Sequence, residues 1–188
     1  MNKRGYHLSK IIYSLSAIFF LYSCSNNANN LISNGKSDYK IFVSDKAIVP
    51  EKYAAEELQS YLHKVSGCNM EITHNKADEA KLIYVGFQEA PPSLTVNLNP
   101  SDFGNEEYII RSDGKSLLIA GGPTRGTLYG VIGYLSDYLG CRWYTSEVTK
   151  IPPSPTISLP KIEDRQKPAF EYREVYWREA YDTAWEVH

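Results

Sequence analysis

The chain has 188 residues with a formal net charge of −2, and 13% of its residues are aromatic, including 15 tyrosines. A mildly acidic chain without a basic cluster is a poor nucleic-acid binder, so we expect no nucleic-acid partner. Tyrosine suits surfaces that contact sugars, but it equally suits strands and cores, and composition alone favours the core interpretation.

The first 23 residues have the pattern of a secretory signal peptide. Basic residues within the first ten precede an apolar run over 11–21 that is broken only by two serines. This run is too short to span a bilayer, which needs roughly 20 apolar residues. Ser23 then stands directly before Cys24, and the stretch from Leu21 to Cys24 resembles the lipobox of bacterial lipoproteins.

That resemblance implies that Cys24 is lipidated and becomes the first residue of the mature chain. We therefore predict a lipoprotein of the cell envelope, held in the outer membrane on its periplasmic or surface side, with the membrane as a partner. The alternative is an ordinary cleaved signal with a chance cysteine. Removal of the signal takes away three basic residues and lowers the charge from −2 to −5. Residues 24–37 are rich in asparagine and serine and are expected to form a flexible tether.

The first elements expected in the folded part are a strand over 39–44 and a long helix. Pro50 suits the first turn of a helix, because its missing N–H has no partner there anyway. Glu51 favours the same end, and Gly67 provides the stop. An apolar stripe at helical spacing lies between them, formed by Ala54, Leu58, Tyr61, Leu62 and Val65.

Several short strands and a second helix follow. Strands are expected over 70–73, 82–86, 107–111 and 116–120, with Asp113-Gly114 as the turn of a hairpin, and the stretch 90–103 is expected to be a loop. The second helix begins after Thr124, the expected N-cap, and ends at Gly140. A last short strand is expected over 141–144, followed by a proline-rich extended connector over 151–160.

This order predicts an α/β fold, an α+β sandwich in which a mixed sheet carries two helices on one face. Residues 38–160 form a domain of ordinary size. Residues 161–188 are too short for a domain of their own, and we expect them to be the first segment of a larger domain that breaks off early.

The glycine-rich stretch 121–126 lies between a strand and a helix, where phosphate-binding loops occur. Pro123 occupies the second glycine position of a dinucleotide fingerprint and removes an N–H, so a tight turn is the favoured interpretation. Gly126, Gly130 and Gly133 share one helical face, which predicts close approach of this helix to its neighbours.

No catalytic constellation is visible. Glu106 and Glu107 are neighbours on a strand, point to opposite faces and are expected to be solvated charges rather than a glycosidase pair. The histidines stand alone, and no metal site or cofactor is expected. Export permits a disulfide between Cys68 and Cys141, but the sequence does not show whether they are close in space.

Four segments carry a family resemblance: A-A-E-E-L-Q-S-Y-L at 54–62, L-I-Y-V-G at 82–86, G-G-P-T-R-G-T-L-Y-G at 121–130 and L-G-C-R-W-Y at 139–144. Together they resemble the N-terminal domain that precedes the barrel in bacterial α-glucuronidases of glycoside hydrolase family 67. They are also similar to the corresponding domain of family 20 β-hexosaminidases and to domains that head large uncharacterised glycosidase-like lipoproteins. The resemblance covers nearly all of 38–160.

The resemblance implies a non-catalytic accessory domain followed by a (β/α)₈ barrel. The stretch Phe170-Glu171-Tyr172-Arg173 is similar to a sugar-binding F-x-W-R motif in the first barrel strand of hexosaminidases, which makes Arg173 a candidate substrate-binding residue. The residues after Arg173 depart from that motif, so the sugar, a uronide or a hexosaminide, stays open. The catalytic carboxylates of these families lie further along the barrel and are absent from this chain.

The expected function is therefore that of an accessory domain in a carbohydrate-degrading lipoprotein, with carbohydrate bound by the missing barrel. The alternative is a stand-alone surface module that binds carbohydrate or a partner protein.

Overall fold

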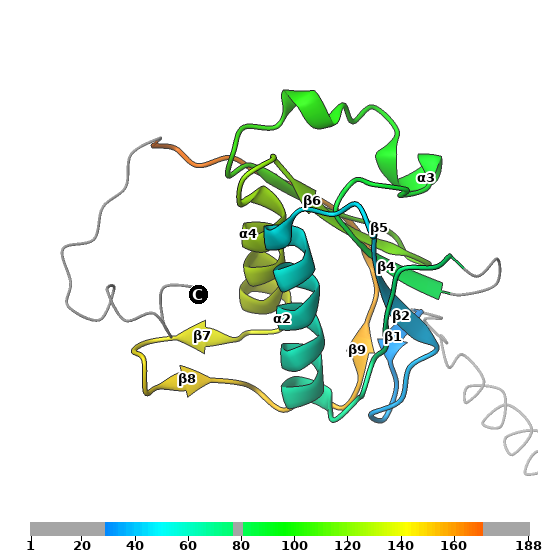
Figure 1. Ribbon diagram of the computed structural model, residues 1–188. Helices are drawn as coiled ribbons and strands as arrows, with labels where there is room; N and C mark the ends of the chain where they lie inside the picture. Colours follow the sequence, from blue (N-terminus) through cyan, green and yellow to red (C-terminus); the bar gives the residue numbers. More distant parts are fainter. Residues whose placement is uncertain (1–28, 77–80, 171–188) are drawn as a thin grey trace, which may run out of the picture.

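The computed structural model describes residues 29–76 and 81–170, and its centre is a six-stranded mixed sheet (Figure 1). The strand order is β10-β5-β6-β4-β2-β3, in which β2, β3, β4 and β6 run parallel while β5 is antiparallel to both of its neighbours. The sheet strands are β2 (Tyr39–Val43), β3 (Ile72–Thr73), β4 (Lys81–Val85), β5 (Tyr108–Asp113), β6 (Leu117–Gly121) and β10 (Lys161–Gln166).

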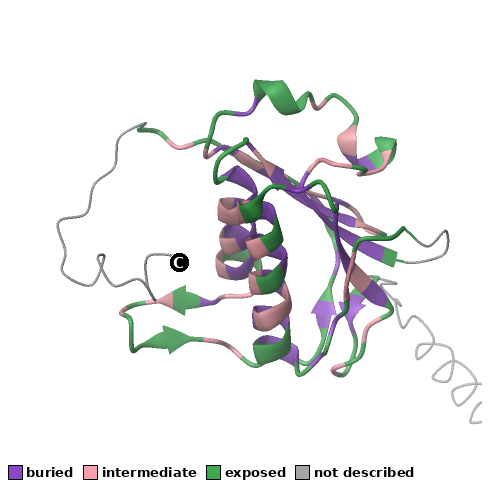
Figure 2. Cartoon of the chain, in the orientation of Figure 1, coloured by how far each residue is buried: buried purple, intermediate pink, exposed green. Residues whose placement is uncertain are grey.

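Two helices cover one face of this sheet, as predicted, and a loop with two short helical turns covers the other (Figure 1). The main helices are α2 (Val49–Ser66) and α4 (Gly126–Gly133), which continues as the π-helix η2 (Tyr134–Tyr138). The covering loop contains α3 (Pro92–Thr95) and η1 (Pro100–Asp102). Figure 2 shows that burial is concentrated in the sheet and on the inner sides of both helices. The fold class is thus confirmed.

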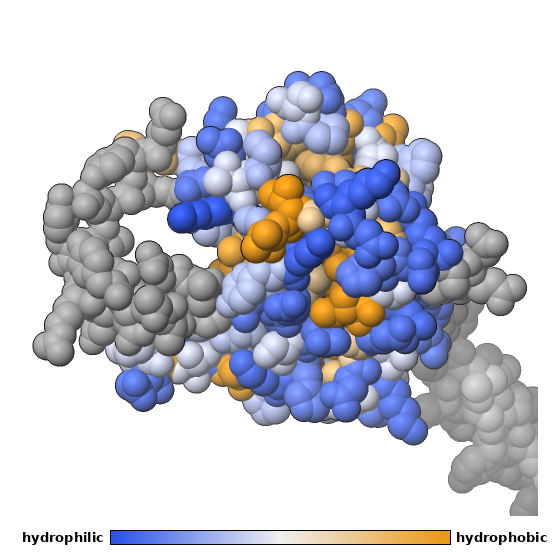
Figure 3. All heavy atoms as spheres, in the orientation of Figure 1, coloured by the Kyte–Doolittle hydropathy of each residue, from blue (hydrophilic) through white to orange (hydrophobic). Residues whose placement is uncertain are grey.

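The alternation of side chains along the strands divides the core into two layers. In β4, Ile83 and Val85 face the helices, whereas Leu82 and Tyr84 face the covering loop. Figure 3 shows that the surface over the helix layer is mostly hydrophilic, with small separate hydrophobic patches. Apolar side chains therefore pack the sheet against the helices on one face and against the covering loop on the other.

The signals that begin and end α2 act as expected. Pro50 lies in its first turn, and the carboxylate of Glu51 accepts a hydrogen bond from the N–H of Ile48 at 3.1 Å. At the other end Gly67 adopts a left-handed conformation with φ of 76°, and its N–H donates to the carbonyl of His63. The Asp113-Gly114 turn is confirmed as well, because the Asp113 carboxylate accepts from the N–H groups of Lys115 and Ser116.

The domain is longer at both ends than the sequence suggested. Part of the expected flexible tether forms β1 (Asn30–Ile32), which pairs with β9 (Ile157–Ser158) and buries Leu31 and Ile32. The start of the segment expected to open the barrel forms β10, which pairs with β5 over six residues. Asn30–Ile32 and Lys161–Gln166 thus pair with strands of this fold, although the sequence placed both outside residues 38–160. The segment 151–160, which was expected to be an extended connector, contains β9. Just before this segment, β7 (Arg142–Trp143) pairs with β8 (Thr149–Lys150).

Candidate functional site

The two residues singled out from the sequence, Cys24 and Arg173, lie outside the described residues. The lipidation of Cys24 and the sugar contact of Arg173 accordingly stay predictions. The described chain ends at Phe170, whose side chain is exposed. The segment before it borders a groove along α4, and this groove is the candidate functional site.

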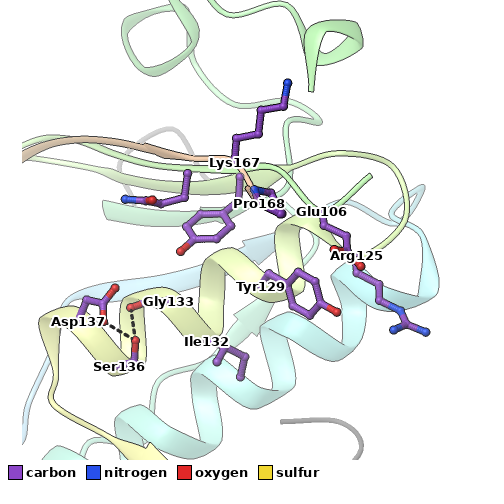
Figure 4. Close-up of a pocket in the computed structure, with 11 residues that line it drawn as sticks. Glu106, Arg125, Tyr129, Ile132, Gly133, Ser136, Asp137, Lys167 and Pro168 are labelled. Atoms are coloured by element: carbon purple, nitrogen blue, oxygen red, sulfur yellow. Dashed lines mark hydrogen bonds between the residues drawn. The ribbon is translucent and has the colours of Figure 1, made fainter. Parts of the chain in front are cut away.

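The α4 groove is a cavity of about 630 Å³ between α4, the first residue of β5 and the end of β10 (Figure 4). Its lining combines tyrosine side chains with charged and hydroxyl groups. The lining residues are Glu106, Tyr108, Arg125, Tyr129, Ile132, Gly133, Ser136, Asp137, Gln166, Lys167 and Pro168. Such a mixture suits a ligand that offers both hydrogen-bonding groups and an apolar surface.

Two glycines allow the groove to form by bringing α4 close to the sheet. A Cβ atom on Gly130 would lie 2.9 Å from the Cγ2 of Ile119, and one on Gly133 would lie 2.6 Å from the hydroxyl of Tyr108. The predicted close approach at these glycines is confirmed. The Tyr108 ring is half-buried as a result, and burial raises the pKa of its hydroxyl, with a further contribution from the negative charges of Asp137 and Asp164.

The change from α-helix to π-helix after Gly133 shapes the far end of the groove. Ser136 Oγ lies 3.1 Å from the carbonyl oxygen of Gly133 and 2.6 Å from Oδ1 of Asp137 (Figure 4). On the neighbouring side of η2, Tyr138 donates to the carboxylate of Asp164 at 3.1 Å, which ties the π-helix to β10. Single π-helical turns are frequent at functional sites, which supports the groove as a binding surface.

The two carboxylates of the groove do not form a hydrolytic pair. Figure 4 places Glu106 and Asp137 at opposite ends of it. Asp137 is exposed and Glu106 is only half-buried. A glycosidase acid must be kept protonated near neutral pH, usually by deep burial against apolar groups. Neither residue has that environment.

Glu107 departs from the expectation of a solvated charge. Only 5% of the residue is exposed, its Oε1 accepts from Nε of Arg165 at 2.7 Å, and its Oε2 accepts from the N–H of Gly104 at 3.1 Å. Burial alone would raise the pKa of Glu107, but these two hydrogen bonds and the charge of Arg165 lower it overall. The Arg165 guanidinium also lies 4.1 Å from the centre of the Phe103 ring. The ion pair of Glu107 and Arg165 therefore stabilises the position of β10 at the sheet edge beside the α4 groove.

The glycine-rich turn is a packing element, as the sequence favoured. Its N–H groups are used within the domain: Gly122 donates to the carbonyl of Glu107 at 2.8 Å and Arg125 to that of Asn105 at 3.0 Å. Gly121 donates to Oγ1 of Thr127 at 3.1 Å. Three amides that a phosphate site would need are thus already bonded. Thr124 was expected to cap α4, but the residue at the cap position is Arg125, and it makes no side-chain cap hydrogen bond.

The described ranges contain no group of three or more histidine, cysteine, aspartate and glutamate side chains that could hold a metal ion. Within them, no helix has the length and apolar content needed to cross a membrane. Cys68 and Cys141 are both buried, and neither forms a disulfide in the structure.

Comparison with known families identifies the domain. Residues 23–134 match the family model described as the glycosyl hydrolase family 67 N-terminus. The chain belongs to this family. The match includes the long helix, the glycine-rich turn and α4, and the predicted resemblance is confirmed. No curated protein sequence matches the chain.

One solved enzyme structure shares the fold, and a second is less similar. A family GH115 4-O-methyl-α-glucuronidase with specificity for decorated arabinogalactans is 21% identical, with a TM-score of 0.60 over 76% of this chain and 19% of that one. A mutant Streptomyces plicatus β-hexosaminidase in complex with its product GlcNAc is 18% identical, with a TM-score of 0.42 over 72% of this chain and 22% of that one. The chain thus spans about a fifth of the length of either enzyme.

Sequence reasoning did not anticipate most of the groove. Arg125 was considered only as part of the glycine-rich turn, and nothing in the local pattern marked Tyr129, Ser136 or Asp137. The glycines at 130 and 133 were the one available signal, because they showed which side of the helix must lie against a neighbour.

Proposed function

We propose that the chain is the non-catalytic N-terminal domain of a glycoside hydrolase-like lipoprotein, in which a following (β/α)₈ barrel performs the hydrolysis. The observation that carries the proposal is the family match over residues 23–134. It sets the domain in the context of carbohydrate degradation. The fold shared with a family GH115 α-glucuronidase supports this assignment.

The proposal that the barrel, and not this domain, performs the hydrolysis rests on the arrangement of the carboxylates. Glu107 accepts a hydrogen bond from Arg165, and Glu51 accepts one from the N–H of Ile48 at the start of α2. Glu106 lines one cavity with Asp137 and another with Glu107, but Asp137 is exposed and Glu107 is engaged by Arg165, so neither pair matches the carboxyl pair that glycosidic cleavage requires. The barrel would supply that pair, and Arg173 would bind the sugar there, since its planar guanidinium suits a diol or a uronate carboxylate.

The proposed anchoring rests on the sequence of the first 24 residues. A lipid on Cys24 would hold the domain at the outer membrane, on its periplasmic or surface side. The strand β1 begins at Asn30, so few residues would separate the lipid from the folded body. The test is a comparison of the wild type with Cys24→Ala by cell fractionation. We expect only the wild type in the membrane fraction, and a variant that stays there would refute the anchoring.

A second candidate function is a stand-alone module that binds carbohydrate or a partner protein. The tyrosine-containing α4 groove favours it, because the groove lies within the domain and needs no barrel to exist. The two candidates differ in what the gene encodes. Sequencing the DNA after the codon for His188 distinguishes them: an open frame rich in barrel strands supports the accessory domain, and a stop codon supports the module.

A further inference from the structure

The chain enters the folded domain at the end of the sheet where the parallel strands begin. Asn29, the first described residue, donates from Nδ2 to the carbonyl of Gly114 in the turn between β5 and β6. Its own carbonyl accepts from the N–H of Leu159 at 2.7 Å. Because β6 starts after this turn and runs parallel to β4 and β2, Asn29 lies at the amino-terminal end of all three strands. We call this end of the sheet, around Asn29, the tether end.

The proposed lipid on Cys24 would hold the tether end close to the membrane. Asn29 follows Cys24 by only five residues. Since an extended chain covers at most about 3.6 Å per residue, these residues reach no further than about 18 Å. The part of the domain that meets the membrane is therefore decided by which side chains surround Asn29.

Two exposed lysines flank the turn that holds Asn29. Lys115 directly follows Gly114, and Lys161 pairs with Asp113 at the start of β10. The carboxylate of Asp113 is used within the turn, where it accepts from two backbone N–H groups. The lysine side chains are therefore the exposed charges of this turn.

Two more exposed lysines lie on the other side of the entry point. Lys36 and Lys81 line one small cavity together with Asn30 and Tyr39. The hydroxyl of Tyr39 donates to the carbonyl of Lys115 at 2.9 Å, which joins this cavity to the turn. The four lysines thus surround one point, the place where the tether meets the domain.

Negative charges at the tether end reduce this positive charge mainly on one side. Among the described carboxylates, Asp38 lies 3.8 Å from Nζ of Lys81. Asp78 and Glu79 precede Lys81 in the chain and lie outside the described residues. In a mature chain with an expected net charge of −5, a positive patch therefore depends on the other three lysines: Lys36, Lys115 and Lys161.

We infer that the tether end lies on the surface of an anionic phospholipid membrane, where Lys36, Lys115 and Lys161 contact the lipid phosphates. The inference rests on the proposed lipidation of Cys24 and adds the orientation of the domain to it. Basic side chains close to a membrane are attracted to anionic head groups, and a basic patch reinforces a lipid anchor.

This orientation makes the domain a spacer. β10 starts with Lys161 at the tether end, and its six residues place Lys167 about 20 Å away at the far end of the sheet. Lys167 lines the α4 groove together with Arg125. Whatever follows Phe170 therefore begins at the end of the domain that points away from the membrane.

The test measures which lysines the membrane protects. The full lipidated chain is inserted into preformed vesicles of phosphatidylcholine with or without phosphatidylglycerol, and a membrane-impermeant reagent acetylates exposed amines. Mass spectrometry then gives the labelling rate of each lysine. With phosphatidylglycerol we expect labelling of the three lysines of the patch to be about fivefold slower, which corresponds to the roughly 1 kcal/mol that a lysine contributes near an anionic surface. High salt should abolish this protection.

Two lysines at the far end serve as references, namely Lys52 in the first turn of α2 and Lys167. Both should be labelled at the same rate in the two kinds of vesicle. Lys115→Gln together with Lys161→Gln should restore fast labelling of Lys36. The matched control, Lys52→Gln together with Lys167→Gln, should leave Lys36 protected, and circular dichroism verifies that both variants fold.

Equal labelling of the patch with and without phosphatidylglycerol, or protection of the reference lysines instead, would overturn the inference. Flotation of the same vesicles tests the anchoring separately. A chain that floats with both kinds of vesicle but is not protected keeps its anchor and loses only the proposed orientation. A chain that floats with neither refutes the lipidation, and the inference with it.

Discussion

Replacement of Gly126 by alanine tests whether the glycine-rich turn is a close-packed joint. Alanine favours a helix over glycine by about 1 kcal/mol, so propensity alone predicts a more stable protein. The added Cβ, however, would meet the carbonyl oxygen of Glu107 and would lie 2.8 Å from the carbonyl carbon of Gly121. Both are main-chain atoms, which cannot turn aside as the end of a flexible side chain can.

The expected cost follows from these two opposing contributions. Overpacking in a well-packed region costs about 1–3 kcal/mol, and a clash with main chain belongs at the upper end. After subtraction of the helix propensity, we expect Gly126→Ala to lower the free energy of unfolding by about 2 kcal/mol. Gly104→Ala is the matched control, because its Cβ would lie 3.7 Å from the Glu107 carboxylate, an ordinary contact. It should be neutral or stabilising by about 0.4–1 kcal/mol.

The assay is urea denaturation followed by circular dichroism, with midpoints compared at equal slope. A Gly126→Ala midpoint at or above that of the wild type would show that the turn tolerates a side chain. The assignment of this stretch to packing would then be wrong, and a binding role for the turn would have to be reconsidered.

Two further substitutions test the ion pair beside the groove and the predicted sugar contact. Glu107→Gln should lower the free energy of unfolding by about 1.5–3 kcal/mol at pH 7, since a charged hydrogen bond to Arg165 is lost. The folded-state pKa of Glu107 is lowered, so its stabilisation is complete above the ordinary value of 4.5 and disappears as the pH falls through the lowered value. The difference in free energy of unfolding between Glu107→Gln and the wild type, measured by urea denaturation, should therefore be large at pH 7 and small in acid. A difference of the same size at both pH values would contradict the ion pair. In a longer relative with the same F-E-Y-R stretch, the equivalent of Arg173→Ala should lower kcat/KM roughly ten- to hundredfold. Unchanged kinetics in a folded variant would show that the motif is coincidental.

Local signals in the sequence were sufficient for the central elements. Pro50 and Gly67 bracket α2, and Asp113-Gly114 turns the hairpin between β5 and β6, because caps and turns depend on neighbouring residues alone. Alternating apolar residues also revealed most of the strands. These signals together were enough to predict a mixed sheet with two helices on one face.

Long-range pairing was not visible in the same way. β1 pairs with β9 across more than a hundred residues, and neither segment carries an alternating pattern long enough to stand out. The segment 161–166 looked like the start of another domain, but Arg165 bonds to Glu107 and places it at the sheet edge. Such partners are decided by tertiary structure.

The candidate site and other contacts between distant side chains were predicted least well. Glu51 appeared only as a favourable charge at a helix start, and Gln88 carried no signal at all. Their meeting above Gly86 depends on how β4 and α2 are placed side by side, which requires the complete fold. The contact between Glu51 and Gln88 therefore became apparent only from the structure.

The most direct test of the proposed non-catalytic role is a hydrolysis assay on the purified full chain, with aryl glycosides that include uronides and N-acetylhexosaminides. We expect no turnover above the uncatalysed rate, because neither carboxylate of the α4 groove is deeply buried among apolar groups as a glycosidase acid is. Sustained turnover that survives repurification and is abolished by Asp137→Asn or Glu106→Gln would contradict this account and make the α4 groove an active site.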